Sequence, residues 1–575
     1  MDNFSFLNDL NSKQQEICQS PRNYILTACP GSGKTRTITY RLAYLQQKYS
    51  SSRKYNIAIT YTNRAAEEIE SRLDDLGIDT SCIWTGTIHQ FCMHFIIRPY
   101  AMYSDRLRKG YRIIDEYVSA EYGRTIANQL GLSYGYDDPL SFPEVCQRYN
   151  QLLVEKKEID FDQILSLSHD LVKSNSYICE NIASIIRSIH VDEYQDTKEL
   201  QYQILAEIIK ANTAINLLFV GDVNQAIYGT LGSVAKSADE IRELYPLEFC
   251  EETLNGCYRS TQRLVDYYRQ FEINTTNAWA VSDIRDNRGV ISYSQSVSFV
   301  NLAQSIADII SSQLQQGIPE SEICVTAPQW YLIFPISKKL QELLPTVHFD
   351  SPNITPFKYD RMNPFYLLAQ LTYTKSGAKV SSRRRIAGEL IDILRNDYEV
   401  AISDQVDAYS ILKVVNSSII PNSDGLTCLN NVISQVFRFL KITSLQETAL
   451  AATCKSFFDK AQYRIKKYDL PCTYDDLVNS FKEKEGVVIS TIHGTKGEEY
   501  QTVIAYGLLR GFLPNWNLIH DQPITAQSEA KKLLYVLCSR AKSNLYLFSE
   551  TGRYTSSRNA YTPSVELLAA RCDYD

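Results

Sequence analysis

The segment over residues 24–47 constrains the fold of this chain more than any other part of it. Residues 24–27 form a short apolar run, residues 28–35 read Ala-Cys-Pro-Gly-Ser-Gly-Lys-Thr, and residues 36–47 have the pattern of a helix. A glycine-rich loop between a strand and a helix directs backbone N–H groups and the positive end of the helix toward phosphate. The segment therefore predicts an α/β fold with a parallel sheet and a phosphate site at one edge of it.

A pair of acidic residues lies far downstream, at the end of a second apolar run. Residues 185–191 predict a buried strand, and Asp192 and Glu193 follow it directly. Because α/β sheets bind ligands at the carboxyl ends of their strands, we expect both acids to face the phosphate loop. Asp192 and Thr35 would hold Mg²⁺, and Glu193 would orient and deprotonate the attacking water. Lys34 would reach the β- and γ-phosphates of ATP.

Strand and helix patterns alternate along two parts of the chain, and each part is interrupted by a mostly helical stretch. Alternation of this kind predicts mainly parallel sheets. The further strands that we expect are 56–60, 215–220, 289–293, 323–327, 486–491 and 501–505. The expected organisation is a first core over 1–95 and 161–265, a helical insertion over 96–160, a second core over 266–375 and 485–575, and a short helical insertion over 376–484.

The composition limits the class of protein. The chain has 575 residues, of which 44% are hydrophobic and 22% charged, as in ordinary globular proteins. It has no apolar run long enough to span a membrane, and its start does not read as a secretory signal. The fourteen cysteines contain no Cys-x-x-Cys pair, so we expect reduced thiols and a cytoplasmic protein. The net charge of −7 argues only weakly against nucleic-acid binding, because local fields decide that.

Nine short motifs follow one another along most of the chain, outside the two insertions. Their residues are 10–14, 28–35, 60–66, 85–89, 192–196, 221–229, 258–260, 491–500 and 534–541. In sequence and in order these motifs resemble those of the UvrD/Rep branch of superfamily 1 DNA helicases. The resemblance implies an α/β fold with two RecA-like parallel-sheet cores, each interrupted by a mainly helical insertion. It also implies that ATP and Mg²⁺ bind between the two cores.

The resemblance implies which residues meet the nucleotide. Gln14 would read the adenine, Arg36 and Tyr258 would pack on its two faces, and Glu499 would hold the ribose. The implied nucleotide-binding residues are Gln14, Gly31, Ser32, Gly33, Lys34, Thr35, Arg36, Tyr258 and Glu499. The implied catalytic residues are Lys34, Glu193, Gln225, Arg259 and Arg540. The two arginines would act as fingers that stabilise the developing charge only when the cleft is closed.

Five further residues are implied to contact DNA. They are Tyr61, Asn63, His89, Tyr228 and His493. Aromatic rings hold single strands by stacking on the bases, without sequence preference. For the two histidines, a purely structural role is the competing interpretation.

The function that these motifs predict is an ATP-dependent 3′–5′ DNA translocase and helicase that acts on single-stranded and junction DNA. The alternative is a DNA-stimulated sensor ATPase of a bacterial anti-phage complex of the Gabija type, which works with a separate nuclease subunit and unwinds poorly alone. Thr230 and Leu231 favour this alternative, because the family usually has Trp-Arg there. The short second insertion favours it too. A phosphate-loop kinase or GTPase would leave Gln14, Arg259 and Arg540 unexplained.

Overall fold

The computed structural model describes most of the chain. The described residues are 4–134, 138–229, 232–350, 355–374, 380–421, 424–442, 449–468, 470–481, 486–555 and 557–575. Thr230 and Leu231, on which the sensor alternative partly depends, lie outside them.

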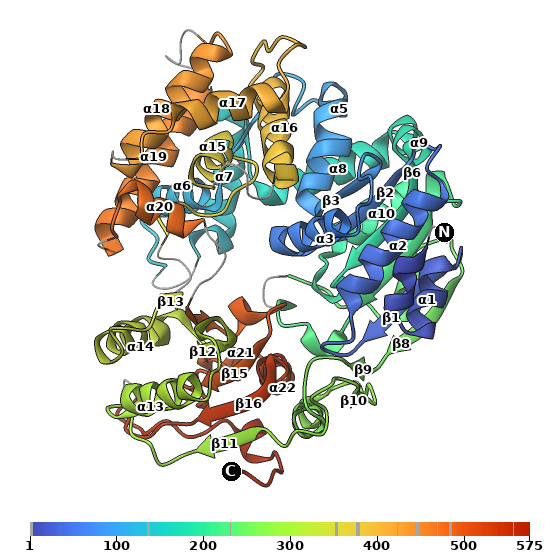
Figure 1. The fold of residues 1–575 in the computed structure, drawn as a ribbon. Helices are drawn as coiled ribbons and strands as arrows, with labels where there is room; N and C mark the ends of the chain where they lie inside the picture. Colours follow the sequence, from blue (N-terminus) through green and yellow to red (C-terminus); the bar gives the residue numbers. More distant parts are fainter. Residues whose placement is uncertain are drawn as a thin grey trace.

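The first α/β unit is built on a six-stranded parallel sheet with the order β3-β2-β6-β7-β1-β8. Its strands are β1 (Asn23–Ala28), β2 (Tyr55–Thr60), β3 (Ile83–Thr87), β6 (Ile186–Asp192), β7 (Asn216–Gly221) and β8 (Phe249–Leu254). Its main helices are α1 (Ser12–Gln19), α2 (Lys34–Lys48), α3 (Asn63–Asp75), α8 (Phe161–Ser174), α9 (Ser176–Ile185), α10 (Glu199–Ala211) and α11 (Ala238–Leu244). The unit lies at the upper right of Figure 1.

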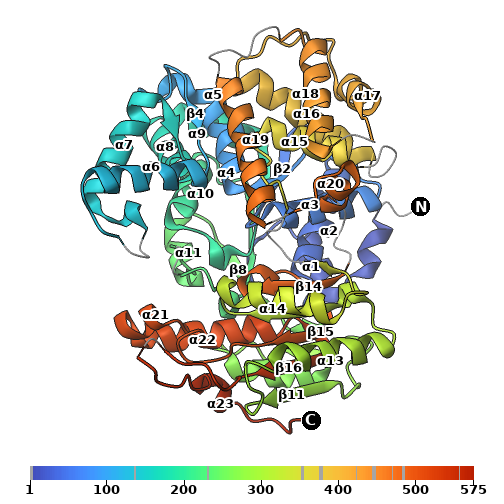
Figure 2. The ribbon, with the colours of Figure 1, turned by 90° about the vertical axis from the view of Figure 1, so that its left-hand side faces the viewer.

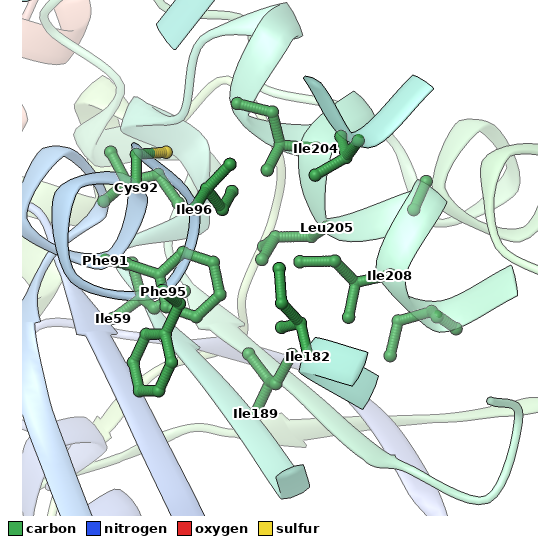
Figure 3. Close-up of a cluster of buried hydrophobic side chains, with 14 of the residues drawn as sticks. Ile59, Phe91, Cys92, Phe95, Ile96, Ile182, Ile189, Ile204, Leu205 and Ile208 are labelled. Atoms are coloured by element: carbon green, nitrogen blue, oxygen red, sulfur yellow. The ribbon is translucent and has the colours of Figure 1, made fainter. Parts of the chain in front are cut away.

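The central strands of this sheet are mostly buried on both faces because helices cover both faces. One face packs on the π-helical stretch Cys92–Ile97, α9 and α10, where the labelled side chains of Figure 3 point toward one another. Phe91, Phe95, Ile189 and Leu205 belong to this cluster and are almost completely buried. The other face packs on α1, α2 and α3.

The second α/β unit is built on another six-stranded parallel sheet, with the order β11-β16-β15-β12-β14-β13. Its strands are β11 (Val290–Ser294), β12 (Ile323–Ala327), β13 (Phe349–Asp350), β14 (Val487–Thr491), β15 (Tyr500–Ala505) and β16 (Ala541–Phe548). Its main helices are α12 (Gln262–Tyr268), α13 (Leu302–Gln315), α14 (Trp330–Leu343), α21 (Trp516–Asp521), α22 (Pro523–Cys538) and α23 (Val565–Leu568). Helices α13 and α14 cover one face and α22 covers the other. The strands β9 (Gly256–Cys257) and β10 (Trp279–Ala280) form a separate parallel pair.

Two helical bodies interrupt these units. The first contains α6 (Glu116–Gln129) and α7 (Pro143–Lys156), with the small parallel pair β4 (Arg112–Ile113) and β5 (Glu158–Ile159). The helices of the second are α15 (Pro364–Tyr373), α16 (Val380–Asn396), α17 (Ala408–Ser418), α18 (Gly425–Phe439), α19 (Ala449–Tyr468) and α20 (Tyr474–Ser480). The α/β fold class with two interrupted parallel-sheet cores is thereby confirmed. Both helical bodies lie above the second unit in Figure 2.

Residues that precede the predicted boundary at residue 376 pack into the core of the second helical body. Phe357 stacks on Phe457 of α19 with ring centroids 5.2 Å apart. The buried side chains of α15 pack with those of α16, α17 and α18. We therefore propose that the insertion starts near Phe357, because the stretch from there through α15 is buried in its core.

This second helical body rests on the first α/β unit, although the chain enters and leaves it from the second unit. The guanidinium of Arg98 donates to both carboxylate oxygens of Asp397, over 2.7 and 2.5 Å. Arg385 of α16 lies 2.5 Å from the carboxylate of Glu70 on α3. The described part of the chain contains no helix that is both long and apolar enough to cross a membrane.

Candidate nucleotide site and nucleic-acid interface

The phosphate loop runs from the end of β1 to the start of α2, as the sequence predicts. Gly31 and Gly33 have φ angles of +71° and +81°, which side-chain-bearing residues rarely adopt. A Cβ atom at Gly31 would lie 2.6 Å from the Cβ of Arg259, so only glycine fits there. The hydroxyl oxygen of Ser32 is buried, and it has no hydrogen-bond partner among the described residues. An unpaired buried hydroxyl in such a loop fits a phosphate oxygen as its partner.

The predicted metal ligands lie side by side at the edge of the sheet. The Thr35 hydroxyl lies 3.4 Å from a carboxylate oxygen of Asp192, which ends β6. Burial, together with the neighbouring Glu193 carboxylate, raises the pKa of Asp192. A nearby cation would lower that pKa again. A hydroxyl and one carboxylate fit Mg²⁺, which takes few protein ligands and keeps phosphate and water oxygens.

Glu193 is held in place by its backbone and by two neighbours. Its φ of +50° is left-handed, which is unusual for a glutamate and turns its side chain back toward the loop. The Lys34 amine lies 3.7 Å from one carboxylate oxygen, and the Gln195 amide donates to the other. Burial opposes the charge of Glu193, but Lys34 and Lys496 outweigh it and lower the pKa. The carboxylate is therefore ionised at neutral pH.

Gln225 and Arg540 meet directly, although they come from different α/β units. Arg540 donates to the side-chain oxygen of Gln225 over 3.1 Å, and the Gln225 amide donates to Asp222 over 2.7 Å. Arg540 is only 2% exposed. Burial, and next the neighbouring Arg259, lower the pKa of Arg540 to about 9, so the guanidinium stays charged at neutral pH. The two predicted residues thus form a contact that spans the cleft.

Arg259 joins the phosphate loop to the second unit. Its Nε donates to a carboxylate oxygen of Glu499 over 2.8 Å, and its Nη1 donates to the Ser539 carbonyl over 2.9 Å. Burial raises the pKa of Glu499, but Arg259 outweighs that effect and lowers it. The backbone N–H of Tyr258 donates to the carbonyl of Gly31 over 2.8 Å. The predicted ribose-binding acid and the predicted arginine finger are therefore direct partners.

Tyr258 and Gln14, two of the residues predicted to meet the adenine, both bond to the phosphate loop. The Asn11 amide donates to the Tyr258 hydroxyl over 2.9 Å, and the Gln14 amide donates to the Ser32 carbonyl over 3.2 Å. Tyr258 is 48% exposed, which leaves a face of its ring accessible. The guanidinium of Arg36 lies 5.3 Å from the centre of the Tyr40 ring.

Lys496 is a residue of this site that the sequence reasoning missed. Its amine donates to Asp196 over 2.5 Å and to the Gln225 carbonyl over 2.6 Å. Both charged groups of the ion pair are buried, at 7% and 0% exposure. Burial raises the pKa of Asp196 to about 6, although Lys496 partly opposes that. In the sequence, this lysine is recognisable only as part of the motif over residues 491–500. Its pairing with Asp196 was not predictable because the two residues are 300 positions apart along the chain.

Three of the predicted DNA residues form one aromatic group across the two units. The rings of Tyr61 and Tyr228 are stacked, with centroids 4.8 Å apart at 25°. The Tyr228 hydroxyl donates to the His493 carbonyl over 3.3 Å, and the two rings are 5.7 Å apart. Burial lowers the pKa of His493, so its imidazole is neutral at neutral pH.

Asn63 and His89, with Tyr61, line a cleft of about 730 Å³ between the first unit and both helical bodies. His89 packs edge-on against Phe161, with ring centroids 5.6 Å apart. Burial, and next Lys198, lower the pKa of His89 to about 4. The cleft wall carries side chains of both charge signs and several aromatic rings. These rings are Tyr61, Phe161, Phe357, Tyr359, Tyr366, Phe457 and Tyr463. Such a wall can hold bases more readily than it can attract phosphates.

Comparison with models of known protein families identifies the family of this chain. The model of the UvrD/REP helicase N-terminal domain matches residues 10–134 and 136–246, and that of the UvrD-like helicase C-terminal domain matches residues 473–551. Together these stretches are more than half of the chain. The chain belongs to the UvrD/REP helicase family. As a member of this family, it is a DNA helicase and an ATP hydrolase.

Curated relatives of this UvrD/REP helicase include three ATP-dependent DNA helicases named PcrA. That of Staphylococcus epidermidis is 24% identical over 96% of this chain and 85% of its own length. That of Leuconostoc citreum is 25% identical over 96% and 83%, and that of Staphylococcus aureus is 23% identical over 96% and 85%. Within this UvrD/REP helicase, Tyr258 and Arg259 lie outside both matched stretches. Their assignment therefore depends on the geometry described above.

Proposed function

We propose that this helicase moves 3′ to 5′ along single-stranded DNA, driven by ATP hydrolysis in the cleft between its two α/β units. The observation that carries the proposal is the contact of Arg540 with Gln225 across the cleft. Arg540 belongs to the second unit and contacts Gln225 of the first unit, beside the place where the γ-phosphate would lie. A charge placed in this way couples ATP hydrolysis to the distance between the two units. The direction of movement is what the resemblance to the family implies.

In this proposal the phosphate loop and α2 bind the phosphates of ATP, with Lys34 on the β- and γ-phosphates. Thr35 and Asp192 would hold Mg²⁺, which when bound would neutralise charge on those phosphates. Glu193 is ionised and would accept a proton from the attacking water. Gln195 fixes the orientation of Glu193 by donating to its carboxylate.

Lys496 would couple the state of the nucleotide site to the bound DNA strand. Its amine bonds to Asp196 and the Gln225 carbonyl, and it also lies 5.0 Å from the centre of the Tyr228 ring. A small movement of Gln225 would therefore move the cation that lies over a proposed base-stacking ring. His89 and His493 are neutral at neutral pH, so in this proposal they contact bases rather than phosphates.

The proposal is tested first by Glu193→Gln, which keeps the shape of the side chain and removes its basicity. DNA-stimulated phosphate release should fall by at least about 100-fold, because that is the usual contribution of a positioned proton acceptor. Binding of a fluorescent ATP analogue and the melting temperature should stay unchanged. Glu243→Gln, at an exposed position of α11, is the matched control and should hydrolyse ATP like the wild type. Undiminished turnover by Glu193→Gln would refute the catalytic assignment.

The direction is tested by streptavidin displacement from single strands that carry biotin at one end. A 3′–5′ translocase displaces streptavidin faster from the 5′ end than from the 3′ end. The reverse preference would contradict the proposed direction. Strong DNA-stimulated hydrolysis without strand separation would instead favour the sensor ATPase.

A further inference from the structure

Lys542 is a partly buried cation beside the predicted ribose-binding acid, Glu499. Its amine lies 3.1 Å from both carboxylate oxygens of Glu322 and 3.6 Å from one carboxylate oxygen of Glu499. The Lys542 side chain is 23% exposed and that of Glu322 is 35% exposed. Water therefore screens these attractions only in part, and the amine is held more firmly than in an exposed ion pair.

The three residues lie at the amino-terminal ends of three neighbouring strands. β16, β15 and β12 are adjacent in the second sheet (Figure 1). Glu322 directly precedes β12, Glu499 directly precedes β15, and Lys542 is the second residue of β16. The backbone N–H of Gln501 in β15 donates to a carboxylate oxygen of Glu322 over 2.9 Å, which anchors Glu322 on the sheet. Because Lys542 is bound to Glu322, its amine has a fixed position beside Glu499.

Glu499 lies between two cations that approach different oxygens of its carboxylate. The Nε of Arg259 donates to Oε2 over 2.8 Å, and the Lys542 amine lies 3.6 Å from Oε1. Burial raises the pKa of Glu499, but Arg259 and, to a smaller extent, Lys542 outweigh that effect and lower it. An ionised carboxylate accepts up to about four hydrogen bonds. Because the Glu499 side chain is also 48% exposed, it can still accept a hydrogen bond from a sugar hydroxyl.

Two hydrogen bonds tie the chain next to Arg259 to the strand that carries Lys542. The Thr261 N–H donates to the Lys542 carbonyl over 3.1 Å, and the Ser260 hydroxyl donates to the preceding carbonyl over 2.7 Å. Both cations that contact Glu499 are therefore bound to the same edge of the second sheet. The Glu499 carboxylate is thus positioned from within the second unit.

We propose that Lys542, held by Glu322, is a positioning residue that fixes the Glu499 carboxylate toward a ribose hydroxyl and so makes this helicase select ATP over its deoxyribose analogues. The inference rests on the proposed function and deepens its nucleotide site. A site built to bond a hydroxyl discriminates against an analogue that lacks it, because the acceptor then loses its partner. A carboxylate that can rotate away from the sugar loses part of that discrimination.

The test measures DNA-stimulated phosphate release by the full chain with ATP, 2′-deoxy-ATP and 3′-deoxy-ATP. The wild type should have a lower KM for ATP than for at least one of the analogues. In Lys542→Gln the KM for ATP should rise about fivefold while kcat changes by less than about twofold, because a sugar contact stabilises the bound substrate and the transition state alike. The KM for the disfavoured analogue should change little, so the selectivity shrinks. Lys542→Arg keeps the charge and should retain most of the selectivity.

Two further variants test the chain of contacts and the specificity of the effect. Glu322→Gln weakens the hold on the Lys542 amine and should raise the KM for ATP in the same direction. Lys542→Gln/Glu322→Gln should be no worse than Lys542→Gln alone, because the two residues act through one contact. Lys210→Gln is the matched control. It removes an exposed lysine that lies 2.8 Å from Glu207 on α10, and it should behave like the wild type.

Three results separate failure of this inference from failure of the proposed function. If Glu499→Ala loses the preference for ATP but Lys542→Gln keeps it, Glu499 holds the ribose and the role of Lys542 is overturned. Equal increases of KM for all three nucleotides in Lys542→Gln would show a purely structural role and overturn it as well. If the wild type shows no DNA-stimulated phosphate release with ATP, the proposed function itself is overturned.

Discussion

At the scale of single residues, Lys496 and Asp196 form a buried ion pair in the cleft. Removing one partner of a buried ion pair leaves an uncompensated charge and costs about 3–5 kcal/mol. Lys496→Met should therefore destabilise the protein by about that amount, as measured by denaturant unfolding. Lys496→Met/Asp196→Leu should recover much of the loss, because it removes both charges. Additive losses in the double variant would contradict the pairing.

His190 predicts a pH dependence of stability. It lies in β6, where its Nδ1 is 3.0 Å from the Ile57 carbonyl and its Nε2 has no partner among the described residues. Burial, and next Arg41, lower its pKa from 6.5 to about 3. Between those pH values the unfolded chain binds a proton that the folded chain does not, so the stability contributed by this site is complete above pH 6.5 and falls as the pH falls.

The check compares the wild type with His190→Gln, which can still donate to the Ile57 carbonyl. The free energy of unfolding of the wild type should decline more steeply as the pH falls from 6.5 to 4, by up to about 1.4 kcal/mol per pH unit. Parallel curves for the two proteins would show that His190 does not titrate in this way.

Residues of the candidate site were predictable where a short motif holds them together. Lys34, Thr35, Asp192 and Glu193 follow from strand ends and a glycine-rich loop, because those are local patterns. Partners such as Lys496 and Gln195 were not predictable in their roles, because their contacts depend on how distant strands are ordered in the sheets.

At the scale of elements, a glycine inside a helix and a glycine in the phosphate loop predict opposite outcomes. Gly388 lies inside α16, where an added Cβ would meet nothing within 4 Å. Gly388→Ala should stabilise the protein by ~0.5–1 kcal/mol, because alanine loses less backbone entropy in a helix. Gly31→Ala places a Cβ against Arg259 at a positive φ, so it should weaken ATP binding. Melting temperature and titration with an ATP analogue measure the two effects, and a stabilising Gly31→Ala would contradict the geometry of the loop.

Most central strands were predictable, as was the edge strand β11, whereas β8 and β16 were not. β7 and β12 are almost wholly apolar because helices cover both faces of their sheets. β8 was not predicted because it lies at the edge of its sheet and carries Glu251 and Glu252. β16 was not predicted because it contains Lys542, Ser543 and Asn544. Asn544 is nevertheless buried, and its amide donates to the side-chain oxygen of Gln313 over 2.8 Å.

At the scale of the whole molecule, the contact between Arg98 and Asp397 fixes the second helical body on the first unit. The two side chains are only 17% and 10% exposed and share two hydrogen bonds. Arg98→Met should leave Asp397 buried without its cation, and amide hydrogen exchange near the end of α16 should become faster. Arg98→Met/Asp397→Leu should restore slow exchange. Unchanged exchange in the single variant would show that other contacts hold this body.

The exposed pair of Lys358 and Glu116 provides the contrast. Its side chains are 68% and 78% exposed, so water and salt screen the attraction. Lys358→Gln should change the same hydrogen exchange little.

The order of strands in the second sheet has a consequence for how the protein is made. β11, β12 and β13 emerge first from a ribosome, yet none of them pairs with another of the three. β11 pairs with β16, β12 with β14 and β15, and β13 with β14. The nascent chain therefore carries three strands with free edges until the last hundred or so residues are synthesised. A cell that makes this protein has to shield those edges for that interval, and a translational stop before β16 leaves β11 without the strand that it pairs with.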